Sequence, residues 1–218
     1  MPAANRERQR PGEAAASPAR WERWLRTFGV AVASIGFGYL FFSNLWWMLP
    51  PDFGCSEDFR FENENADGLC FWIGTFSSEP RTVLTTFLEP APLGLALDGL
   101  PRANGAFIDS FVKPNIEWFG WVIWGTVAFV SLSLILGFLS RLGALAAFVV
   151  SIELMLGLTG ISSPRTWEWS FPLMVLLSIA LFGLAPGRYF GLDRLLRARL
   201  MTPRGGGSRL RRLLLALT

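Results

Sequence analysis

The apolar residues of this chain lie in long blocks and do not recur at the short periods that are typical of a water-soluble core. Four blocks are long enough to cross about 30 Å of hydrocarbon, which takes about 20 residues. They cover residues 25–49, 116–139, 142–160 and 167–185. Each is predicted to be a helix, because the backbone must satisfy its own hydrogen bonds in lipid and no barrel-like alternation is visible. The pattern therefore predicts an all-α membrane protein, a bundle of four transmembrane helices.

Composition narrows the chemistry. Of the residues, 51% are hydrophobic, there is no histidine, and there are only two cysteines. This excludes CxxC, HExxH and Ser-His-Asp chemistry and removes the usual imidazole ligands of metals and haem. We therefore expect no haem, no iron–sulfur cluster, no metal and no nucleic-acid partner. A redox or hydrolytic role would need carboxylates, the thiols, a bound organic cofactor or a partner chain.

Positive charge indicates the orientation of the predicted bundle. Arginines lie at or before the start of the first block (Arg6, Arg8, Arg10, Arg20, Arg23 and Arg26) and follow the last (Arg188, Arg194, Arg197, Arg199, Arg204, Arg209, Arg211 and Arg212). Because positive charge resists translocation, both termini are predicted to be cytoplasmic, in an inner (plasma) membrane protein. The connection 50–115, which carries an acidic excess, then lies outside the cell.

Three regions follow from this plan. Residues 1–23 have almost no bulky apolar side chains and are predicted to be a disordered, basic cytoplasmic tail. Residues 24–200 form the transmembrane domain. Residues 201–218 are a flexible basic tail, either frayed or lying on the anionic lipid surface. A cleaved signal peptide is the rival interpretation of the N-terminus, but the apolar block is too long for one.

The connection 50–115 is too long to be structureless. It contains Cys55 and Cys70 on the oxidising side. A disulfide here would close a loop of about 15 residues and contribute about 3 kcal/mol. A catalytic dithiol and unpaired thiols are the alternatives. Apolar stretches at 82–97 and 105–112 are predicted to be short helices that form an extracytoplasmic lid between the first two transmembrane helices.

Glu153 lies inside the third block, about 10 Å below the outer end of its helix. Because a charge at mid-helix costs about 2.5 to 3.5 kcal/mol on insertion, we expect Glu153 to face inward. It would be protonated or hydrogen-bonded to a polar layer of Tyr39, Asn44 and Thr126. A buried carboxylate is a natural proton acceptor beside a quinone or on a proton path. A structural hydrogen bond between helices is the alternative.

Other residues are predicted to hold the bundle together. Small residues recur along the third helix at Gly143, Ala147 and Ser151, which permits close helix contact. Arg188 and Asp193 follow the fourth helix and are predicted to form a structural clamp at the inner surface. Tryptophans gather in the outer half, as in an interfacial aromatic belt. The alternative is that some of them line a pocket for a flat, conjugated ligand.

Three motifs resemble the DoxX/DoxD family of four-helix membrane proteins: "VKPN" before the second block, "LILGFLSRLGALAA" across the turn into the third, and "APGRYFGLD" after the fourth. The resemblance covers about residues 105–196. It implies a small integral membrane subunit, which in DoxD-like members belongs to a thiosulfate:quinone oxidoreductase. The family usually carries a glutamate early in the second helix, where this chain has Thr126 and Val127. Glu153 of the neighbouring helix could take its place.

These observations leave two main functional hypotheses. The first is a subunit of a quinone-linked electron-transfer complex, part of a quinone-dependent oxidoreductase. The quinone would lie near Glu153, Tyr39, Asn44 and Thr126, with its ring packed by Trp121 or Trp124. The second is a non-enzymatic scaffold or assembly protein that docks an exported partner through its outer loop. A transporter is a weaker hypothesis, because no inverted repeat or broken helix is visible.

Overall fold

The computed structural model describes residues 20–56, 59, 61, 67–77, 99–158, 170–201, 214–215 and 217–218. The elements named in these ranges are all helical, as predicted. They are α1 (Arg20–Leu45), α2 (Gly68–Ser77), α5 (Gly99–Phe107), the π-helical turn η1 (Ile108–Val112), the 3-10 turn η2 (Lys113–Asn115), α6 (Ile116–Leu136), α7 (Ser140–Leu158), α8 (Ser170–Leu184), the 3-10 turn η3 (Pro186–Arg188) and α9 (Leu192–Met201). The helix expected at 82–97 and most of both tails lie outside the described residues.

Within the described residues, four helices are long and apolar enough to span a membrane: Arg20–Leu45, Ala103–Leu136, Ser140–Gly157 and Ser170–Arg188. The predicted number of spans is confirmed. The second span differs from the prediction, because α5, η1, η2 and α6 follow one another without a non-helical break. The stretch 105–112 is therefore part of this long helical run, which begins at Gly99, and not a separate surface helix. Proline is tolerated at this point because Pro114 lies in the first turn of η2, where its missing N–H is not needed.

The first helix ends at Leu45, earlier than the predicted residue 49. Ser43 Oγ and Asn44 Nδ2 both donate to the carbonyl oxygen of Leu40, at 2.8 and 2.7 Å. Such side-chain bonds compete with the helical backbone ladder. The chain then continues through tight turns, in which the N–H of Met48 donates to the carbonyl of Leu45.

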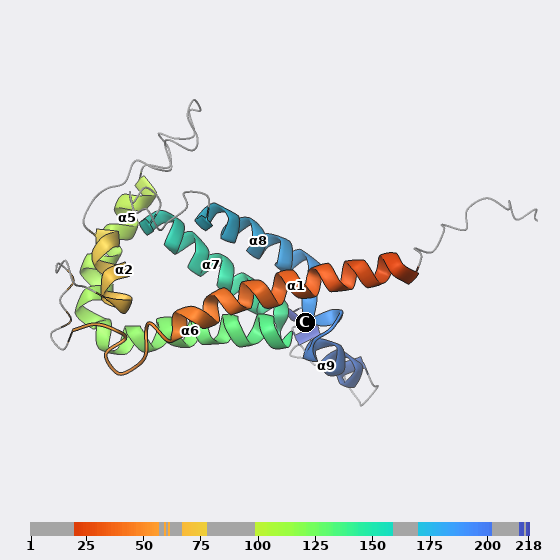
Figure 1. The fold of residues 1–218 in the computed structure, drawn as a ribbon. Helices are drawn as coiled ribbons and strands as arrows, with labels where there is room; N and C mark the ends of the chain where they lie inside the picture. The colour runs from red at the N-terminus through yellow and green to blue at the C-terminus, as the bar shows by residue number, and fades with distance from the viewer. Residues whose placement is uncertain are drawn as a thin grey trace, which may run out of the picture.

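The four long helices form two packed pairs, α1 with α6 and α7 with α8, joined by contacts between α6 and α7. Figure 1 shows the pairs converging at one end, near α9, and diverging at the other, where α2 and α5 lie between them. We call these the closed end and the open end. The N-terminal part of α1 extends beyond the closed end. Because the pairs diverge, the open end has room for a cavity.

Small residues allow the helices to approach closely. Ser34 Oγ of α1 donates to the carbonyl of Leu134 in α6 at 2.8 Å, and a Cβ on Gly38 would lie 2.9 Å from Ile135 Cγ1. On α7, Ala147 and Ser151 are completely buried. A Cβ at Gly143 would collide with the side chain of Ser133 in α6. The predicted small-residue face of α7 is therefore a helix contact face.

The closed end is held by Asp193, which is completely buried. Its carboxylate accepts hydrogen bonds from the backbone N–H of Leu139 (2.6 Å) and Ser140 (2.9 Å), and from Ser140 Oγ (2.7 Å). The carboxylate thus satisfies N–H groups at the positive end of the α7 dipole. The Asp193 N–H donates to the carbonyl of Gly137, the left-handed cap of α6, at 2.9 Å. Asp193 therefore clamps α9 to the α6–α7 turn, as predicted.

The open end carries the predicted Cys55–Cys70 disulfide. It joins the turn after α1 to α2, and the N–H of Leu69 donates to the carbonyl of Phe53 at 2.9 Å. Phe53 is fully buried, and its ring packs so tightly on α6 that a Cβ at Gly120 would lie 2.5 Å from Phe53 Cε2. The disulfide unit, residues 53–55 with α2, is thereby fixed on α6.

Candidate functional site

A cavity of about 270 Å³ lies at the open end between α6 and α7, bounded also by α2, α5 and η1. The described residues that line it are Leu69, Trp72 and Ile73 of α2, Phe107 of α5, Ile108 and Val112 of η1, Phe119, Val122, Ile123 and Thr126 of α6, and Val149, Val150, Glu153 and Leu154 of α7. The α6 members recur at intervals of three and four residues, so they share one helix face. We call this space the α6–α7 cavity.

The α6–α7 cavity has a buried apolar floor and an exposed rim. Ile73 of α2 and Ile108 of η1 are nearly inaccessible in the floor. Val122 of α6 and Val149 of α7 are 47% and 54% exposed at the rim. Both valines belong to candidate membrane spans. The cavity therefore opens sideways, between two helices, toward the hydrocarbon of a surrounding membrane.

Glu153 lines this cavity. Its side chain is exposed, whereas a buried, inward-facing carboxylate was expected from the sequence. The side-chain amide of Asn104 in α5 is its hydrogen-bond partner. Sequence reasoning did not identify Asn104, because only the packing of α5 against α7 brings the two residues together. The predicted hydrogen-bonding layer around Glu153 thus differs from the observed one.

Thr126 lines the same cavity as Glu153, from the opposite wall. Its hydroxyl donates to the carbonyl of Val122 one turn earlier, at 2.7 Å. The hydroxyl oxygen keeps its lone pairs as acceptors toward the cavity. The cavity therefore combines an apolar interior with one carboxylate and one hydroxyl, and the amide of Asn104 lies beside the carboxylate. In the part of the chain that the structure describes, no group of three His, Cys, Asp or Glu could hold a metal ion.

A protein-family model described as "TQO small subunit DoxD" matches residues 101–204. The resemblance to the DoxX/DoxD family is thereby confirmed over these residues. With its four apolar helices, the chain is a multi-pass membrane protein. The DoxD match covers both walls of the α6–α7 cavity and the Asp193 clamp, but not α1 or the disulfide unit. No curated protein and no solved structure matches the chain.

The DoxD resemblance gives the position of Thr126 a particular meaning. From the sequence, we expect the family's glutamate early in the second helix to fall at Thr126 or Val127. Thr126 lines the α6–α7 cavity, whereas Val127 is buried in the core. A carboxylate at position 126 would thus lie on the wall that faces Glu153. The cavity retains a carboxylate, supplied from α7 and not from α6.

The other residues proposed from the sequence do not line this cavity. Tyr39 is 61% exposed on α1, and Asn44 bonds within its own helix. Trp121 lines a separate, open pocket at the open end and packs edge-on against Phe53, with ring centroids 5.7 Å apart. Trp124 contacts Trp121, and its indole nitrogen is buried without a hydrogen-bond partner among the described residues.

The aromatic rings of the α6–α7 cavity are instead those of Trp72, Phe107 and Phe119. Sequence reasoning did not distinguish Trp72 from the other tryptophans of the outer half. The sequence signal for Trp72 is the segment "CFW", which begins with the disulfide cysteine Cys70. The disulfide holds α2, and with it Trp72, against the bundle. Trp72 packs partly buried against the hydrophobic core from this position.

Proposed function

We propose that this protein is the membrane subunit of a quinone-linked electron-transfer complex and binds a quinone headgroup in the α6–α7 cavity. The observation that carries the proposal is the combination of a sideways-opening apolar cavity with Glu153, Asn104 and Thr126 at one place. Small-molecule sites are mostly apolar with a few convergent polar groups. The description of the matching family as a TQO small subunit supports the same reaction class.

The dimensions and chemistry of the cavity fit a quinone. A volume of about 270 Å³ is large enough for a substituted quinone ring. Trp72 and Phe119 offer aromatic surfaces for this ring. The exposed rim at Val122 and Val149 allows an isoprenoid tail to remain in the hydrocarbon. A lipid-soluble ligand could therefore enter without crossing water.

A bound quinone would supply two-electron, two-proton redox chemistry. The chain would position the quinone ring and exchange protons with its oxygen atoms. Glu153 would donate a hydrogen bond to a ring carbonyl oxygen when protonated, and when ionised it would accept the proton that the ring hydroxyl of the reduced form releases. Asn104 donates to the Glu153 carboxyl and holds it toward the cavity. Thr126 can accept a hydrogen bond from a ring hydroxyl on the opposite wall. The electrons would come from a partner subunit with its own redox group.

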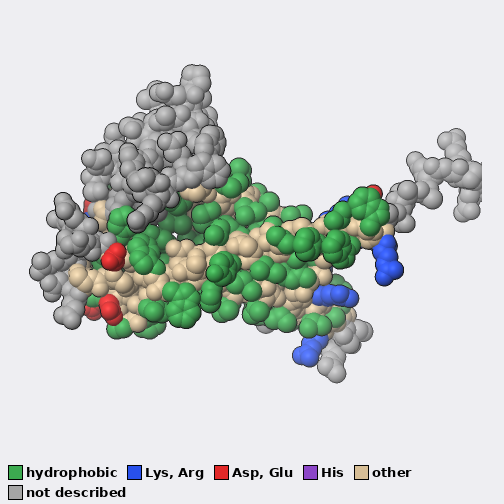
Figure 2. Space-filling view, viewed as in Figure 1, with side chains coloured by type: hydrophobic (Ala, Val, Ile, Leu, Met, Phe, Trp, Pro, Cys, Tyr) green, Lys and Arg blue, Asp and Glu red, His purple; other side chains and the backbone are tan. Residues whose placement is uncertain are grey.

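The membrane orientation is part of the proposal. Figure 2 shows most of the visible Lys and Arg side chains at the closed end and along the N-terminal part of α1, and most of the visible Asp and Glu at the open end. The positive-inside rule then assigns the closed end to the cytoplasm. The disulfide at the open end agrees, because disulfides persist in oxidising compartments. We infer a plasma-membrane protein whose cavity lies in the outer half of the bilayer.

The proposal is tested by measuring quinone in gently purified protein, by extraction and mass spectrometry. The key variant is Glu153→Gln, and the matched control is Glu117→Gln, an exposed glutamate of α6 that lines the separate pocket. Loss of a charged hydrogen-bonding group should weaken quinone binding about ten-fold in Glu153→Gln and leave the control unchanged. No specific quinone in the wild type, or equal retention in both variants, would reject the site.

A second candidate function is a non-enzymatic scaffold that docks an exported partner. The open pocket of about 630 Å³ at the open end favours it, because Trp118 and Trp121 are 51% and 53% exposed there beside Asp52 and Glu117. Exposed tryptophans are frequent anchors in protein interfaces. Under this hypothesis Trp118→Ala would release a copurifying exported protein, and Glu153→Gln would have no effect on any property of the complex.

A further inference from the structure

Three arginines from three different elements meet at the closed end. Arg141 lies in the first turn of α7, Arg188 ends η3, and Arg197 lies on α9. All three are half-buried, and the charges of Arg141 and Arg197 both act on Arg188. The guanidinium carbon of Arg141 lies 6.0 Å from the ring centroid of Phe182 in α8, which orients it. We call these residues the arginine cluster.

In the described part of the chain, the three positive charges of the arginine cluster face two negative groups, Asp193 and the terminal carboxylate of Thr218. Asp193 is the carboxylate that attracts Arg188. Its oxygens, however, already accept three hydrogen bonds from Leu139 and Ser140 at the start of α7. Like charges held together at a partly buried site favour the binding of an anion between them.

Arg197 adds a second, independent observation. Its Nη1 is buried and has no hydrogen-bond partner in the described part of the chain. A buried donor without a partner costs about 1 to 3 kcal/mol, so native structures rarely retain one. Arg188 Nε, in contrast, donates to an oxygen of the terminal carboxylate of Thr218 at 2.6 Å. An acceptor at the arginine cluster would satisfy Arg197.

The position of the cluster indicates where this acceptor comes from. Arg188 is the last residue of the candidate span Ser170–Arg188, and Arg141 is the second residue of the span Ser140–Gly157. The cluster therefore lies at the depth of lipid headgroups. On α9, Leu192 and Leu195 are 45% and 63% exposed, as in a helix that lies along the membrane surface. In a bilayer, lipid acyl chains and phosphate groups would both reach this place.

We propose that Arg141, Arg188 and Arg197 bind the phosphate of an anionic phospholipid. Arginine is suited to this task because its planar donors match phosphate oxygens in pairs. Basic pockets between helices at the cytoplasmic membrane surface bind such headgroups. The site is at the opposite end of the molecule from the α6–α7 cavity. Its side of the membrane rests on the orientation inferred above, but the binding itself does not depend on the quinone proposal.

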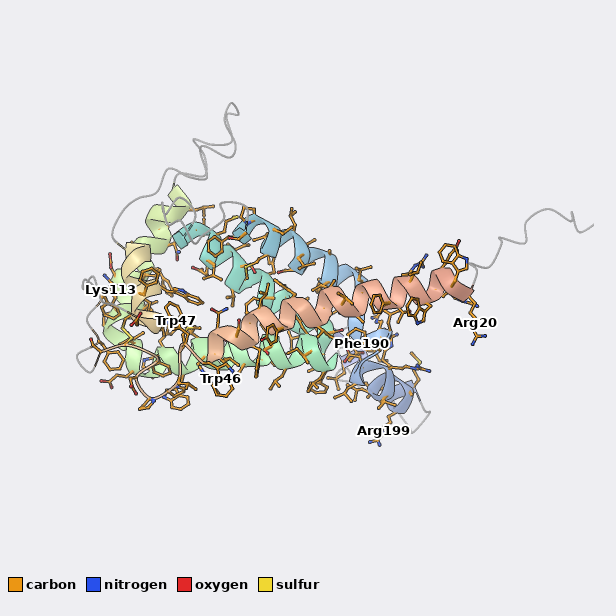
Figure 3. All side chains as sticks on the ribbon, viewed as in Figure 1. Arg20, Trp46, Trp47, Lys113, Phe190 and Arg199 are labelled. Carbon is orange, nitrogen blue, oxygen red and sulfur yellow. A yellow bond between two sulfur atoms is a disulfide. The ribbon has the colours of Figure 1, made fainter. Side chains whose placement is uncertain are left out.

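The test uses the full chain in nanodiscs of phosphatidylcholine with a minor share of phosphatidylglycerol. After transfer to detergent, native mass spectrometry counts the phosphatidylglycerol molecules retained per protein. The variants are Arg188→Gln and Arg197→Gln. The control is Arg199→Gln, which removes the same charge from the same helix. Figure 3 shows Arg199 on α9 directed away from the bundle.

Each cluster variant should weaken phosphatidylglycerol retention about ten-fold, because a hydrogen bond to a charged group is lost, and Arg199→Gln should not. Equal losses in all three variants would show only diffuse attraction and overturn the site. Thermal unfolding in pure phosphatidylcholine verifies that the variants fold. If one does not, Arg197→Lys takes its place, and the same weakened phosphatidylglycerol retention is expected. Stabilisation by inorganic phosphate alone, as strong as that by phosphatidylglycerol, would identify a free-anion site and overturn the lipid proposal.

Discussion

Asp193→Ala tests the clamp that joins α9 to the α6–α7 turn. The substitution removes the acceptor of three hydrogen bonds, at 2.6, 2.9 and 2.7 Å, from Leu139 and Ser140. Hydrogen bonds to a charged group contribute about 1.5 to 3 kcal/mol each, but bonds that share one acceptor are not additive. Removing one partner from a buried charged interaction costs about 3 to 5 kcal/mol. We expect the free energy of unfolding to fall by that amount.

The assay is reversible unfolding in mixed micelles by titration with dodecyl sulfate, followed by tryptophan fluorescence. Asp193→Asn retains the shape and one acceptor oxygen, so its loss should be smaller than that of Asp193→Ala. The control is Asp109→Asn. Asp109 pairs with Lys113 at 2.7 Å, but its side chain is 51% exposed. Such surface pairs contribute about 0 to 1 kcal/mol.

The reasoning is refuted if Asp193→Ala changes the free energy of unfolding by no more than the Asp109 control. That result would mean that water replaces the carboxylate at the closed end without cost. A large loss for Asp193→Ala with a small one for Asp109→Asn would instead establish the clamp as a principal source of stability.

Three further predictions follow from particular contacts. Gly120→Ala places a Cβ 2.5 Å from Phe53 Cε2 and should destabilise the fold by about 1 to 3 kcal/mol in the same titration. Gly125→Ala on the same helix meets nothing within 4 Å and should stabilise by up to about 1 kcal/mol; equal effects would contradict the Phe53 contact. Replacing Cys55 and Cys70, which are separated by 15 residues, with serine should cost about 3 kcal/mol, and unchanged stability would show that the disulfide does not constrain the unfolded chain. A reporter fused after the last residue should be active only in the cytoplasm, and extracellular activity would reverse the orientation.

The four spans could be predicted from the sequence because lipid requires long, uninterrupted apolar helices. The bounds of the second span could not, because apolarity does not distinguish a break from a continuous helical run. Residues 105–112 are apolar enough for a surface helix, and only the structure shows them joined to α6. The Asp193 clamp was recognisable from its motif. Its partners Leu139 and Ser140 are more than 50 residues away, at separations of 54 and 53, and required the fold.

The candidate site, too, could be predicted from the sequence only in part. Counting from helix ends places Tyr39, Asn44, Thr126 and Glu153 at comparable depths. Depth alone does not give the direction of a side chain, because successive helical residues are rotated by about 100°. Thr126 and Glu153 lie on faces that meet, whereas Tyr39 and Asn44 do not reach the cavity. The cavity itself depends on the divergence of two helix pairs, for which no local sequence signal exists.

The most direct test of the central claim is photoaffinity labelling with an azido-quinone in native membranes, with the adducts located by mass spectrometry of peptides. The account predicts labelling of the cavity-lining segments 119–126 of α6 and 149–154 of α7. Excess unlabelled quinone should compete for these adducts, and Glu153→Gln should reduce them. Labelling spread over the lipid-facing surfaces of α1 and α8, without competition, would contradict a quinone site in the α6–α7 cavity.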